Sequence, residues 1–361
     1  MKVISANAPY GEGGLGGFLA AVVEEARTTG ELERYYSVAG RINDPCGQTI
    51  SLERWAPLFR LPPLRWRHSW RELLAAECFD HAVARQLATI DVFHGFSGTC
   101  LRSFRQARRI GVRELIVESA TSHIDNVWCQ HRAVATVYPI EESWLGTALY
   151  RKTLREYALA DTIVVSSEYA RQSFLVRGVP SSKMRRRAQT VGRRFTPPPA
   201  WQKQPGFHVI YVGRLQATKG VPVLMDAFAR LEDPDATLTL VGGTATEAMD
   251  RYLQNRLAAD RRITIAPGDP LPHLHRADLL VHPTYEDGLA LAPMEALACG
   301  VPVLVTDDTG MKEHVSTGQN GFVLPTGDVD ALVEHLRLIR ARPLRGTFQP
   351  LPPADRLVCE D

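Results

Sequence analysis

The stretch from Ala277 to Val305 constrains the fold of this chain more strongly than any other. It begins with Leu279–His282, a short apolar run of the kind that forms a strand buried in a parallel sheet. Pro283 ends the run, and the polar turn after it carries two acids, Glu286 and Asp287. A buried strand followed at once by an acidic turn is typical of a parallel sheet with polar loops at its carboxyl edge.

A helix and a second strand complete this unit. Pro293 suits the first turn of a helix, because the N–H that proline lacks has no helical partner there. Gly300 suits the C-terminal cap of that helix, and Val303–Val305 forms the next strand. The order is strand, acidic loop, helix, strand. We expect Glu295, in the first helical turn, to face the crevice where open parallel sheets bind ligands.

The same segment resembles the signature of the retaining glycosyltransferase family 4, whose members have the GT-B fold. That signature is an acid, seven residues, a glutamate, a helix of small residues and then G-x-P-V; Asp287 and Glu295 meet the spacing, and Glu286 is one residue too early. The family's usual G-F-G after the acid is replaced here by Gly288, Leu289 and Ala290. The resemblance implies that Asp287 contacts the donor sugar and acts in catalysis, and that Glu295 binds the ribose hydroxyls. The alternative is an acidic turn whose glutamate is stabilised by the helix dipole.

Composition narrows the class of protein. A chain of 361 residues suggests two domains, and a net charge of +2 indicates no bulk attraction to nucleic acid. The six cysteines form no C-x-x-C motif, so we expect neither a zinc site nor a disulfide framework. The N-terminal apolar run is too short for a signal peptide, and no uncharged apolar run reaches membrane-spanning length. We therefore expect a cytoplasmic protein.

The first half of the chain opens with a glycine-rich segment. Lys2–Ala6 predicts a strand, Gly11–Gly17 a loop, and the residues after it a helix. Such a loop lets backbone N–H groups approach a phosphate, although a flexible turn is the alternative. In the family, the loop of the N-terminal domain that covers the donor diphosphate is matched by Gly14, Leu15 and Gly16.

Two further predicted strands of this half end near titratable side chains. Ile90–His94 contains the D-V-x-H run found in many relatives, and Arg113–Glu118 precedes His123. Relatives often carry a histidine at the end of the second strand, near the reacting sugar, where this chain has Glu118 or Ser119. His94, Glu118 and His123 are therefore candidate catalytic residues with no assigned role, and a structural histidine is the alternative at each His.

One segment of this half mixes aromatic and basic residues. Pro57–Arg71 interleaves Phe, Leu and Trp with four arginines. This pattern can mark a membrane surface or acceptor-binding segment, which adds an expectation of peripheral contact with the inner membrane face. A loop packed on the core with solvated arginines is the alternative.

The remaining patterns of this half predict helices and a linker. We expect helices over Ser69–Thr89 and Glu141–Ala160, and a strand, loop and helix over Ala160–Phe174. The proline-rich Thr196–Gly206 is the expected interdomain linker. The predicted domains are thus an acceptor domain, residues 1–195, a donor domain, residues 206–345, and an irregular tail, residues 346–361. Relatives usually continue with more helices, so we expect the chain to be truncated or divergent in this tail.

The second half repeats the strand, loop, helix pattern. His208–Val212 predicts a strand, followed by a loop with Arg214 and Lys219 and a helix over Val223–Leu231. Two cations on one such loop can neutralise a diphosphate, and in the family they hold the donor diphosphate; surface charges are the alternative.

Strands are also expected over Thr237–Val241, Arg262–Ala266 and Gly321–Leu324, with a final helix over Asp328–Arg340. In relatives the nucleobase lies against the loop that contains Gly268 here.

Two apparent metal motifs have simpler explanations. Asp328 and Asp330 form a D-x-D, but Asp328 suits a helix N-cap. His273 and His275 are two residues apart and would diverge on a helix, so we predict no metal.

The resemblance implies an α/β protein of GT-B fold, with two Rossmann-like domains facing across a cleft. It implies retaining transfer of a hexose from a nucleotide-diphosphate sugar, UDP-linked or GDP-linked, to a glycan, lipid or small molecule, with no cofactor beyond this co-substrate. A non-catalytic nucleotide-sugar binding protein and another GT-B enzyme, such as an epimerase or a phosphorylase, are the alternatives.

Overall fold

The computed structural model describes residues 1–38, 43–62, 64, 66–199, 201 and 203–352. Contacts divide the chain into two compact units. The first contains Met1–Cys129 and Glu142–Gln189, and the second contains Gln130–Glu141 and the chain from Thr190 onward. The predicted linker, Thr196–Gly206, therefore lies near the start of the second unit. The helix α5 (Ile124–Val137) contributes residues to both units.

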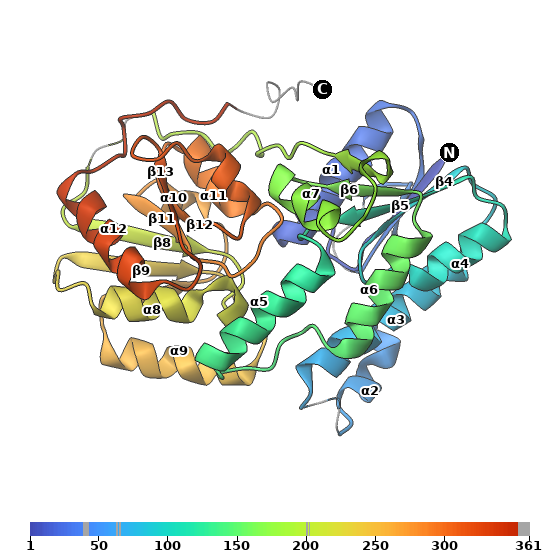
Figure 1. Ribbon diagram of the computed structural model, residues 1–361, viewed down its shortest axis with the longest axis horizontal. Helices are drawn as coiled ribbons and strands as arrows, with labels where there is room; N and C mark the ends of the chain where they lie inside the picture. Colours follow the sequence, from blue (N-terminus) through green and yellow to red (C-terminus); the bar gives the residue numbers. More distant parts are fainter. Residues whose placement is uncertain (39–42, 63, 65, 200, 202, 353–361) are drawn as a thin grey trace. The chain divides into compact units, whose positions relative to one another are not determined.

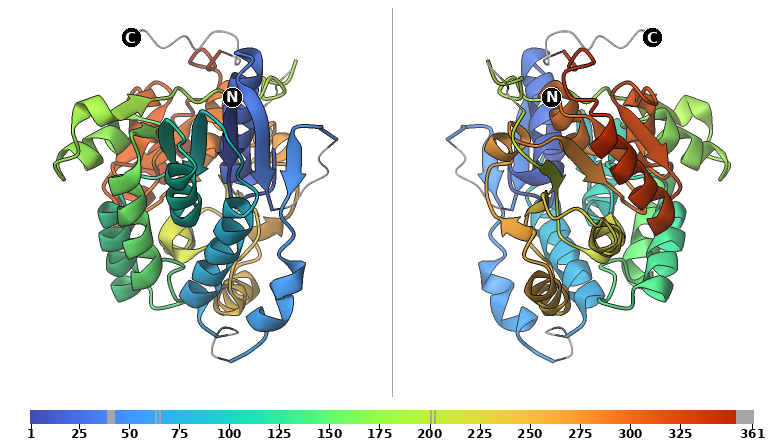
Figure 2. Two further views of the ribbon diagram at one scale, coloured as in Figure 1. Left: turned by 90° about the vertical axis from the view of Figure 1, so that its right-hand side faces the viewer. Right: turned by 90° about the vertical axis from the view of Figure 1, so that its left-hand side faces the viewer.

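The first unit is built on a parallel sheet of seven strands in the order β3-β2-β1-β4-β5-β6-β7 (Figure 1, Figure 2). The strands are β1 (Lys2–Ser5), β2 (Leu32–Ser37), β3 (Gly47–Thr49), β4 (Val92–Phe96), β5 (Glu114–Ser119), β6 (Thr162–Val165) and β7 (Met184–Arg186). The main helices are α1 (Gly13–Thr28), α2 (Ala56–Phe59), α3 (His68–Ala84), α4 (Leu101–Arg109), α6 (Thr147–Leu159) and α7 (Glu168–Leu175).

Successive side chains of these strands point to opposite faces of the sheet, so each strand contributes to an apolar layer on either side. Phe93 and Leu115 join a core formed with α3, α4 and α6. The neighbouring His94 and Glu118 point to the other face. Helix α1 packs there, and its buried residues Phe18, Leu19, Val22 and Val23 recur at helical spacing.

The second unit has a parallel sheet of six strands in the order β10-β9-β8-β11-β12-β13 (Figure 1). The strands are β8 (Phe207–Val212), β9 (Ala236–Val241), β10 (Ile263–Ala266), β11 (Leu279–His282), β12 (Val303–Thr306) and β13 (Gly321–Leu324). The helices are α8 (Val221–Ala229), α9 (Glu247–Ala259), α10 (Leu271–Leu274), α11 (Leu291–Ala298) and α12 (Val329–Ala341), with short 3-10 turns η3 (Ala217–Lys219) and η4 (Gly310–His314).

Apolar cores cover both faces of this sheet. Val209 and Tyr211 of β8 pack with α8, α9 and α12, whereas Ile210 packs with α10 and α11. This explains why the strands read as nearly continuous apolar runs. The predicted strands Leu279–His282 and Gly321–Leu324 are confirmed, and Gly300 caps α11 with a left-handed φ of 72°.

The sequence prediction of one long helix over Glu141–Ala160 is wrong. Helix α6 begins only at Thr147. The side chain of Glu141 accepts hydrogen bonds from the Ala217 N–H at 2.7 Å and from Thr246 Oγ1 at 2.6 Å, both in the second unit. These tertiary contacts override the local helical pattern. The helices α5 and α9 and the short strands β3 and β7 were not predicted.

The predicted glycine loop is shorter than expected. Helix α1 begins at Gly13, so Gly14, Leu15 and Gly16 form its first turn rather than a loop. The helix start packs tightly, since a Cβ at Gly16 would lie 2.0 Å from the carbonyl oxygen of Pro9. A side chain at position 16 would therefore push the preceding turn away from the helix.

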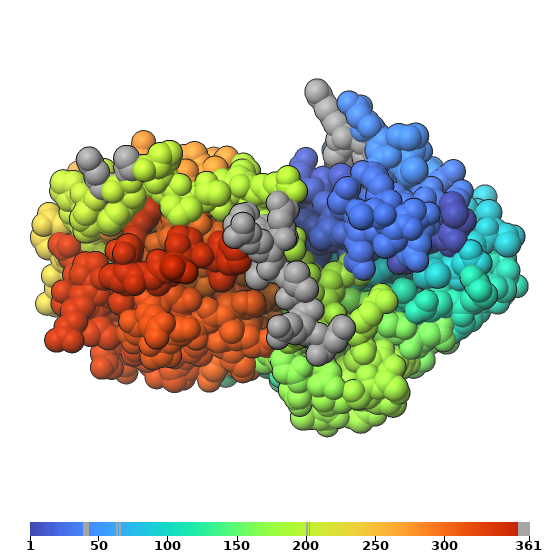
Figure 3. Space-filling view, turned by 90° about the horizontal axis from the view of Figure 1, so that it is seen from above, coloured from blue at the N-terminus to red at the C-terminus, as the bar shows by residue number. Residues whose placement is uncertain are grey.

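The chain after α12 crosses the surface of the second unit, where it is drawn in dark red (Figure 3). The Leu351 N–H donates to the Leu297 carbonyl of α11 at 3.3 Å. The Arg345 guanidinium donates to the Leu274 carbonyl at 3.1 Å and lies 4.7 Å from the ring centroid of Trp201. Gly346–Pro352 contains neither helix nor strand, and the rest of the predicted tail lies outside the described residues. Nowhere in the described chain does a helix have the length and apolar character needed to cross a membrane.

Candidate functional site

Two loops of the second unit meet at the carboxyl ends of β8 and β11, which are neighbours in the sheet. Lys219 ends the short turn η3 after β8, and Asp287 follows β11. Lys219 Nζ donates to Asp287 Oδ2 at 2.7 Å and to the Glu286 carbonyl oxygen at 3.2 Å. The strand order thus brings together two residues that the family resemblance assigns to different parts of a donor.

The charge of Asp287 is fixed by its surroundings. Burial opposes its ionisation, but the charge of Lys219 and the contact with His282 outweigh burial and hold the pKa of Asp287 below its ordinary value. His282 Nε2 lies 3.5 Å from Asp287 Oδ2, and burial lowers the pKa of this histidine. Asp287 is therefore a carboxylate, and an acceptor of hydrogen bonds, across the whole neutral range.

A close approach of backbones holds the two loops together. A Cβ at Gly220, directly after Lys219, would lie 1.8 Å from the Pro283 carbonyl oxygen, and the backbone there is left-handed with a φ of 72°. Only glycine satisfies both demands. On the same loop, Arg214 is exposed, and its carbonyl oxygen accepts a hydrogen bond from the Tyr211 hydroxyl at 2.8 Å. The loop is thus anchored while the Arg214 guanidinium faces solvent.

The two acids of the turn occupy different environments. The Glu286 side chain is buried, whereas part of Asp287 is accessible. The Glu286 backbone shapes the turn, since its N–H donates to Thr284 Oγ1 at 3.3 Å and its carbonyl accepts from the same hydroxyl at 2.9 Å. Of the two acids, Asp287 is thus the one with a partly accessible side chain.

The N-terminus of α11 lies directly after this turn. Gly288, Leu289 and Ala290 connect Asp287 to the helix, and no side chain of the described residues caps it. The Gly310 N–H donates to the Asp287 carbonyl at 3.1 Å, which ties the turn to η4. A helix N-terminus without a side-chain cap, shortly after the turn that contacts Lys219, is a suitable place for a negatively charged group.

Glu295, in the second turn of α11, is partly buried. Burial raises the pKa of Glu295 to about 7; nearby Arg194 opposes this rise, and Asp269 adds to it. Arg194 in turn pairs with Asp269 at 2.9 Å, on the loop that contains Gly268. The predicted ribose-binding acid and the predicted nucleobase loop therefore lie near each other.

The second half of α5 lies near this site, although no local sequence pattern indicated it. The second half of α5 belongs to the second unit, where Gln130 Nε2 donates to Asp308 Oδ2 at 2.7 Å. Burial, and to a lesser extent the charge of Lys219, lowers the pKa of the neighbouring His131 to about 3. The imidazole of His131 is therefore neutral near pH 7 and close enough to Lys219 to feel its charge.

The candidate residues of the first unit form a buried cluster. His94 Nε2 and Glu118 Oε2 lie 3.0 Å apart, and both side chains are almost fully buried. Arg187 lies 3.5 Å from Glu118 and 3.2 Å from Glu25 of α1. Burial lowers the pKa of His94, although Glu118 opposes this shift. The structure thus pairs His94 with Glu118 beneath α1, away from solvent.

His123 packs against aromatic side chains. Its ring centroid is 5.3 Å from that of Tyr157 and 4.9 Å from that of Phe174, and its backbone N–H donates to Ser173 Oγ at 2.7 Å. Burial lowers the pKa of His123 to about 4, so its imidazole is neutral near pH 7. Leu15, by contrast, is among the exposed apolar residues at the start of α1.

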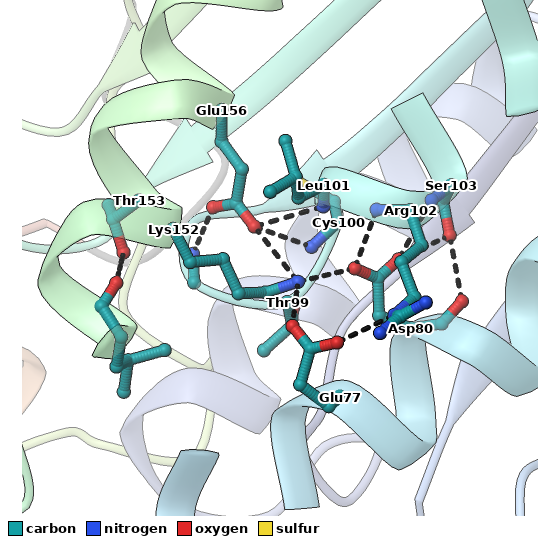
Figure 4. A network of polar contacts seen from close by, with 12 residues as sticks. Glu77, Asp80, Thr99, Cys100, Leu101, Arg102, Ser103, Lys152, Thr153 and Glu156 are labelled. Carbon is teal, nitrogen blue, oxygen red and sulfur yellow. Dashed lines mark hydrogen bonds and ion pairs between the residues drawn. The ribbon is translucent and has the colours of Figure 1, made fainter. Parts of the chain in front are cut away.

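The loop after β4 is held by a buried charge network (Figure 4). Glu156 of α6 accepts hydrogen bonds from the N–H groups of Cys100 and Leu101 at 2.9 and 3.0 Å. Asp80 of α3 accepts from the next two N–H groups, both at 2.8 Å. Lys152 lies between the carboxylates, at 2.5 Å from Asp80 and 3.7 Å from Glu156. Two buried acids thus cap α4, and one buried lysine compensates them.

Known proteins resemble this chain in sequence. Residues 199–345 match the family described as glycosyl transferases group 1. The D-inositol 3-phosphate glycosyltransferase of Salinispora tropica is 34% identical over 169 residues, which are 43% of this chain and 34% of that protein. The GDP-mannose-dependent alpha-(1-6)-phosphatidylinositol monomannoside mannosyltransferase of Mycolicibacterium smegmatis is 29% identical over 59% of this chain and 62% of its own length. The matches thus span only part of these relatives.

Solved structures resemble it over nearly its whole length. Sucrose-phosphate synthase from Thermosynechococcus elongatus has a TM-score of 0.74 at 19% identity, covering 96% of this chain and 91% of that one. HepE of Anabaena, in complex with UDP and glucose, has a TM-score of 0.66 at 14% identity, covering 96% and 92%.

Two parallel α/β sheets with these neighbours define a protein of the GT-B fold, as the sequence predicted. The region that matches the glycosyl transferases group 1 model, residues 199–345, contains Arg214, Lys219, Asp287 and Glu295. The family resemblance drawn from the sequence is thereby confirmed.

Proposed function

We propose that this protein is a retaining glycosyltransferase, which moves a hexose from a nucleotide-diphosphate sugar to an acceptor. The pair formed by Lys219 and Asp287 is the observation that carries the proposal. The pair supports the proposal because a cation, which suits a phosphate, and an ionised acceptor, which suits a sugar hydroxyl, lie on two loops of the same sheet edge; α11, which has no side-chain cap, begins shortly after Asp287. The family match and the glycosyltransferases among its relatives support the same activity.

Each group has a part in the reaction. Arg214, Lys219 and the α11 N-terminus stabilise the charge of the departing diphosphate, so the reaction needs no metal. Asp287 holds the sugar, and Glu295 accepts hydrogen bonds from the ribose hydroxyls. The bond between the anomeric carbon and the phosphate oxygen breaks, the acceptor oxygen bonds to that carbon on the same face, and its proton passes to the leaving phosphate. This route needs no second carboxylate at the sugar, which suits a Glu295 that binds ribose.

The nucleobase is proposed to be uracil. The structural neighbour HepE has been solved with UDP and with UDP-glucose, which supports this choice. A GDP-linked donor is the second candidate, because the relative from Mycolicibacterium smegmatis is described as GDP-mannose-dependent. The first unit is proposed to bind the acceptor.

A thermal-shift comparison of UDP-glucose, UDP-galactose and GDP-mannose tests the donor. A specific donor raises the melting temperature because its binding energy adds to the stability of the folded state. Release of free nucleoside diphosphate on addition of acceptor then tests transfer, with Arg214→Ala as the matched weak-binding variant. Absence of a shift with every nucleotide sugar would overturn the proposal.

A specific observation favours a non-catalytic binding protein as the second candidate. His94 and Glu118, two of the three candidate catalytic residues of the first unit, are buried against each other. A thermal shift without release of diphosphate, for all acceptors tried, would support this alternative.

A further inference from the structure

The first unit contains a large cavity that the proposed function does not use. Its volume is about 770 Å³, within the usual range for ligand sites. The walls are mainly apolar, and all lining residues belong to the first unit. The main apolar contributors are Leu64, Trp70, Leu73, Leu74, Trp128 and Leu149. A cavity of this size between α3 and the start of α6 can hold an alkyl chain.

The surface beside the cavity is unusually apolar. Four of the eleven exposed large apolar side chains among the described residues lie within positions 58–70. They include Trp66, at 69% exposure, and Trp70, at 48%. Figures 1 and 2 show α2, which begins this segment, at the lower end of the first unit, near α3. Exposed apolar side chains gathered in one place mark a surface that binds a partner or a membrane.

The same surface carries positive charge. Arg54, Arg60, Arg67 and Arg71 are all exposed, and the Arg67 guanidinium lies 5.8 Å from the ring centroid of Trp70. Tryptophan and arginine together suit the interface between lipid headgroups and acyl chains, where the ring is buried and the cation meets phosphate. This charge favours a lipid with an anionic headgroup over an uncharged ligand.

A polar position lies at the cavity wall. Glu142 Oε1 accepts hydrogen bonds from Arg67 Nε at 3.0 Å and from Ser69 Oγ at 2.8 Å. The other oxygen, Oε2, is buried and has no hydrogen-bond partner among the described residues. An unpaired buried carboxylate oxygen is costly, and a hydroxyl donor of a ligand would satisfy it.

We propose that this cavity binds an alkyl chain of an anionic, hydroxyl-bearing membrane lipid, and that the exposed apolar and basic side chains described above dock on the headgroup surface. The chain enters between Trp70 and Trp128, the arginines meet lipid phosphates, and a headgroup hydroxyl donates to Glu142. The binding itself is independent of glycosyl transfer. That the bound lipid is the sugar acceptor rests on the proposed function.

Vesicles of phosphatidylglycerol with brominated acyl chains test the proposal, because bromine quenches tryptophan fluorescence on contact. We expect the protein to sediment with these vesicles and its fluorescence to fall, and Trp128→Phe to remove part of the quenched signal. Trp201→Phe, in the second unit, is the matched control and should leave it unchanged. Failure to bind phosphatidylglycerol vesicles, or binding equal to that of phosphatidylcholine vesicles, would overturn the docking surface.

Two further variants distinguish vesicle binding by the exposed surface from binding of the alkyl chain in the cavity. Arg71→Gln should weaken vesicle binding about fivefold, the equivalent of about 1 kcal/mol for a basic residue near an anionic surface, whereas Arg109→Gln on α4 should not. Ala148→Phe narrows the cavity from its exposed side and should remove the Trp128 quenching while sedimentation persists. Unchanged quenching in Ala148→Phe would overturn the cavity assignment. Arg214→Ala should bind vesicles normally, so failure of the donor site does not affect this test.

Discussion

Lys219 and Asp287 are bound to each other, with Nζ and Oδ2 2.7 Å apart, on loops that follow two neighbouring strands. The family resemblance assigns one to the diphosphate and the other to the sugar of a single donor. Their contact means that the cation is already held in place before a ligand arrives. On the proposed function, a donor phosphate would share Lys219 with Asp287, which would couple recognition of the diphosphate to recognition of the sugar.

Loss of either loop cation should weaken nucleoside diphosphate binding. Arg214→Ala and Lys219→Ala each remove a charged hydrogen bond of about 1.5–3 kcal/mol, which corresponds to roughly 10-fold to 150-fold in affinity. Calorimetric titration with UDP measures this. If both variants bind UDP as tightly as the natural protein, the phosphate assignment is wrong.

The same two variants should differ in stability. Lys219→Ala leaves the mostly buried Asp287 carboxylate without its cation and should cost about 3 kcal/mol, near the lower end for a broken buried pair. Arg214 is exposed, so Arg214→Ala should change stability by less than about 0.5 kcal/mol. Urea unfolding followed by far-UV circular dichroism distinguishes the two. Equal stability would mean that the pair contributes nothing to the folded state.

Substitution of the three acids should have different effects on nucleotide affinity and on turnover, because each acid has a different role. Glu295→Gln should weaken both free nucleotide and nucleotide sugar, because the ribose is present in both. Asp287→Asn should spare free nucleotide and lower turnover, since its contact exists only with a hexose bound. Glu286→Gln is the control, because its side chain is buried in the turn. A silent Asp287→Asn together with an inactive Glu286→Gln would show that the register of the acidic turn is wrong.

How much of this site the sequence predicted depends on the range of the contacts. The strand Leu279–His282, the turn with Asp287 and the cap at Gly300 follow from local patterns, because apolar runs, prolines and glycines act within a few residues. The pairing of Lys219 with Asp287 depends on β8 and β11 being neighbours, although β9 and β10 lie between them in the chain. No local pattern encodes that order.

The errors have the same origin. The segment that begins with Glu141 has helical spacing, but its carboxylate binds groups of the second unit, and the helix starts later. The contribution of His131 to the Lys219 environment was missed because α5 itself was not predicted. Distant partners decided both outcomes, and a single sequence does not show them.

The pH dependence of nucleotide binding should reveal Glu295. Burial raises the pKa of Glu295 from 4.5 to about 7. The neutral form is therefore favoured by folding: this contribution to stability is complete below pH 4.5 and is lost as pH rises through 7. Ribose hydroxyls bind the carboxylate better than the acid, so UDP should bind more tightly at pH 8 than at pH 6.

Calorimetry of the natural protein and of Glu295→Gln at the same two pH values isolates this effect. The titration of the UDP phosphate affects both proteins equally, so it cancels in the ratio of their UDP affinities. We expect this ratio to change by up to about tenfold between the two pH values, corresponding to a ligand-induced shift of roughly one unit in the pKa of Glu295. A ratio independent of pH would remove Glu295 from the ribose site.

The buried network around Lys152 should be the most sensitive point of the first unit. Lys152, Asp80 and Glu156 are all nearly inaccessible, and the carboxylates also cap α4 (Figure 4). Lys152→Met leaves two buried acids without their cation and should cost about 3–5 kcal/mol at pH 8. Arg102→Met is the matched control, since Arg102 pairs with Glu77 at an exposed position and should cost less than about 1 kcal/mol.

The stability lost in Lys152→Met should also depend on pH. Burial raises the pKa of Glu156 to about 7, against the opposing charge of Lys152, and removal of that lysine raises it further. Below pH 7 Glu156 is protonated in the folded state of both proteins, so Glu156 adds nothing to the difference in their free energies of unfolding. At pH 8 Glu156 is ionised in the natural protein, but the variant must keep it protonated, which costs additional free energy. Urea unfolding at pH 5.5 and pH 8, followed by the fluorescence of the first unit, therefore should show a smaller difference at the lower pH. A loss as small as that of Arg102→Met at both pH values would mean that Lys152 does not hold the loop after β4 through its charge.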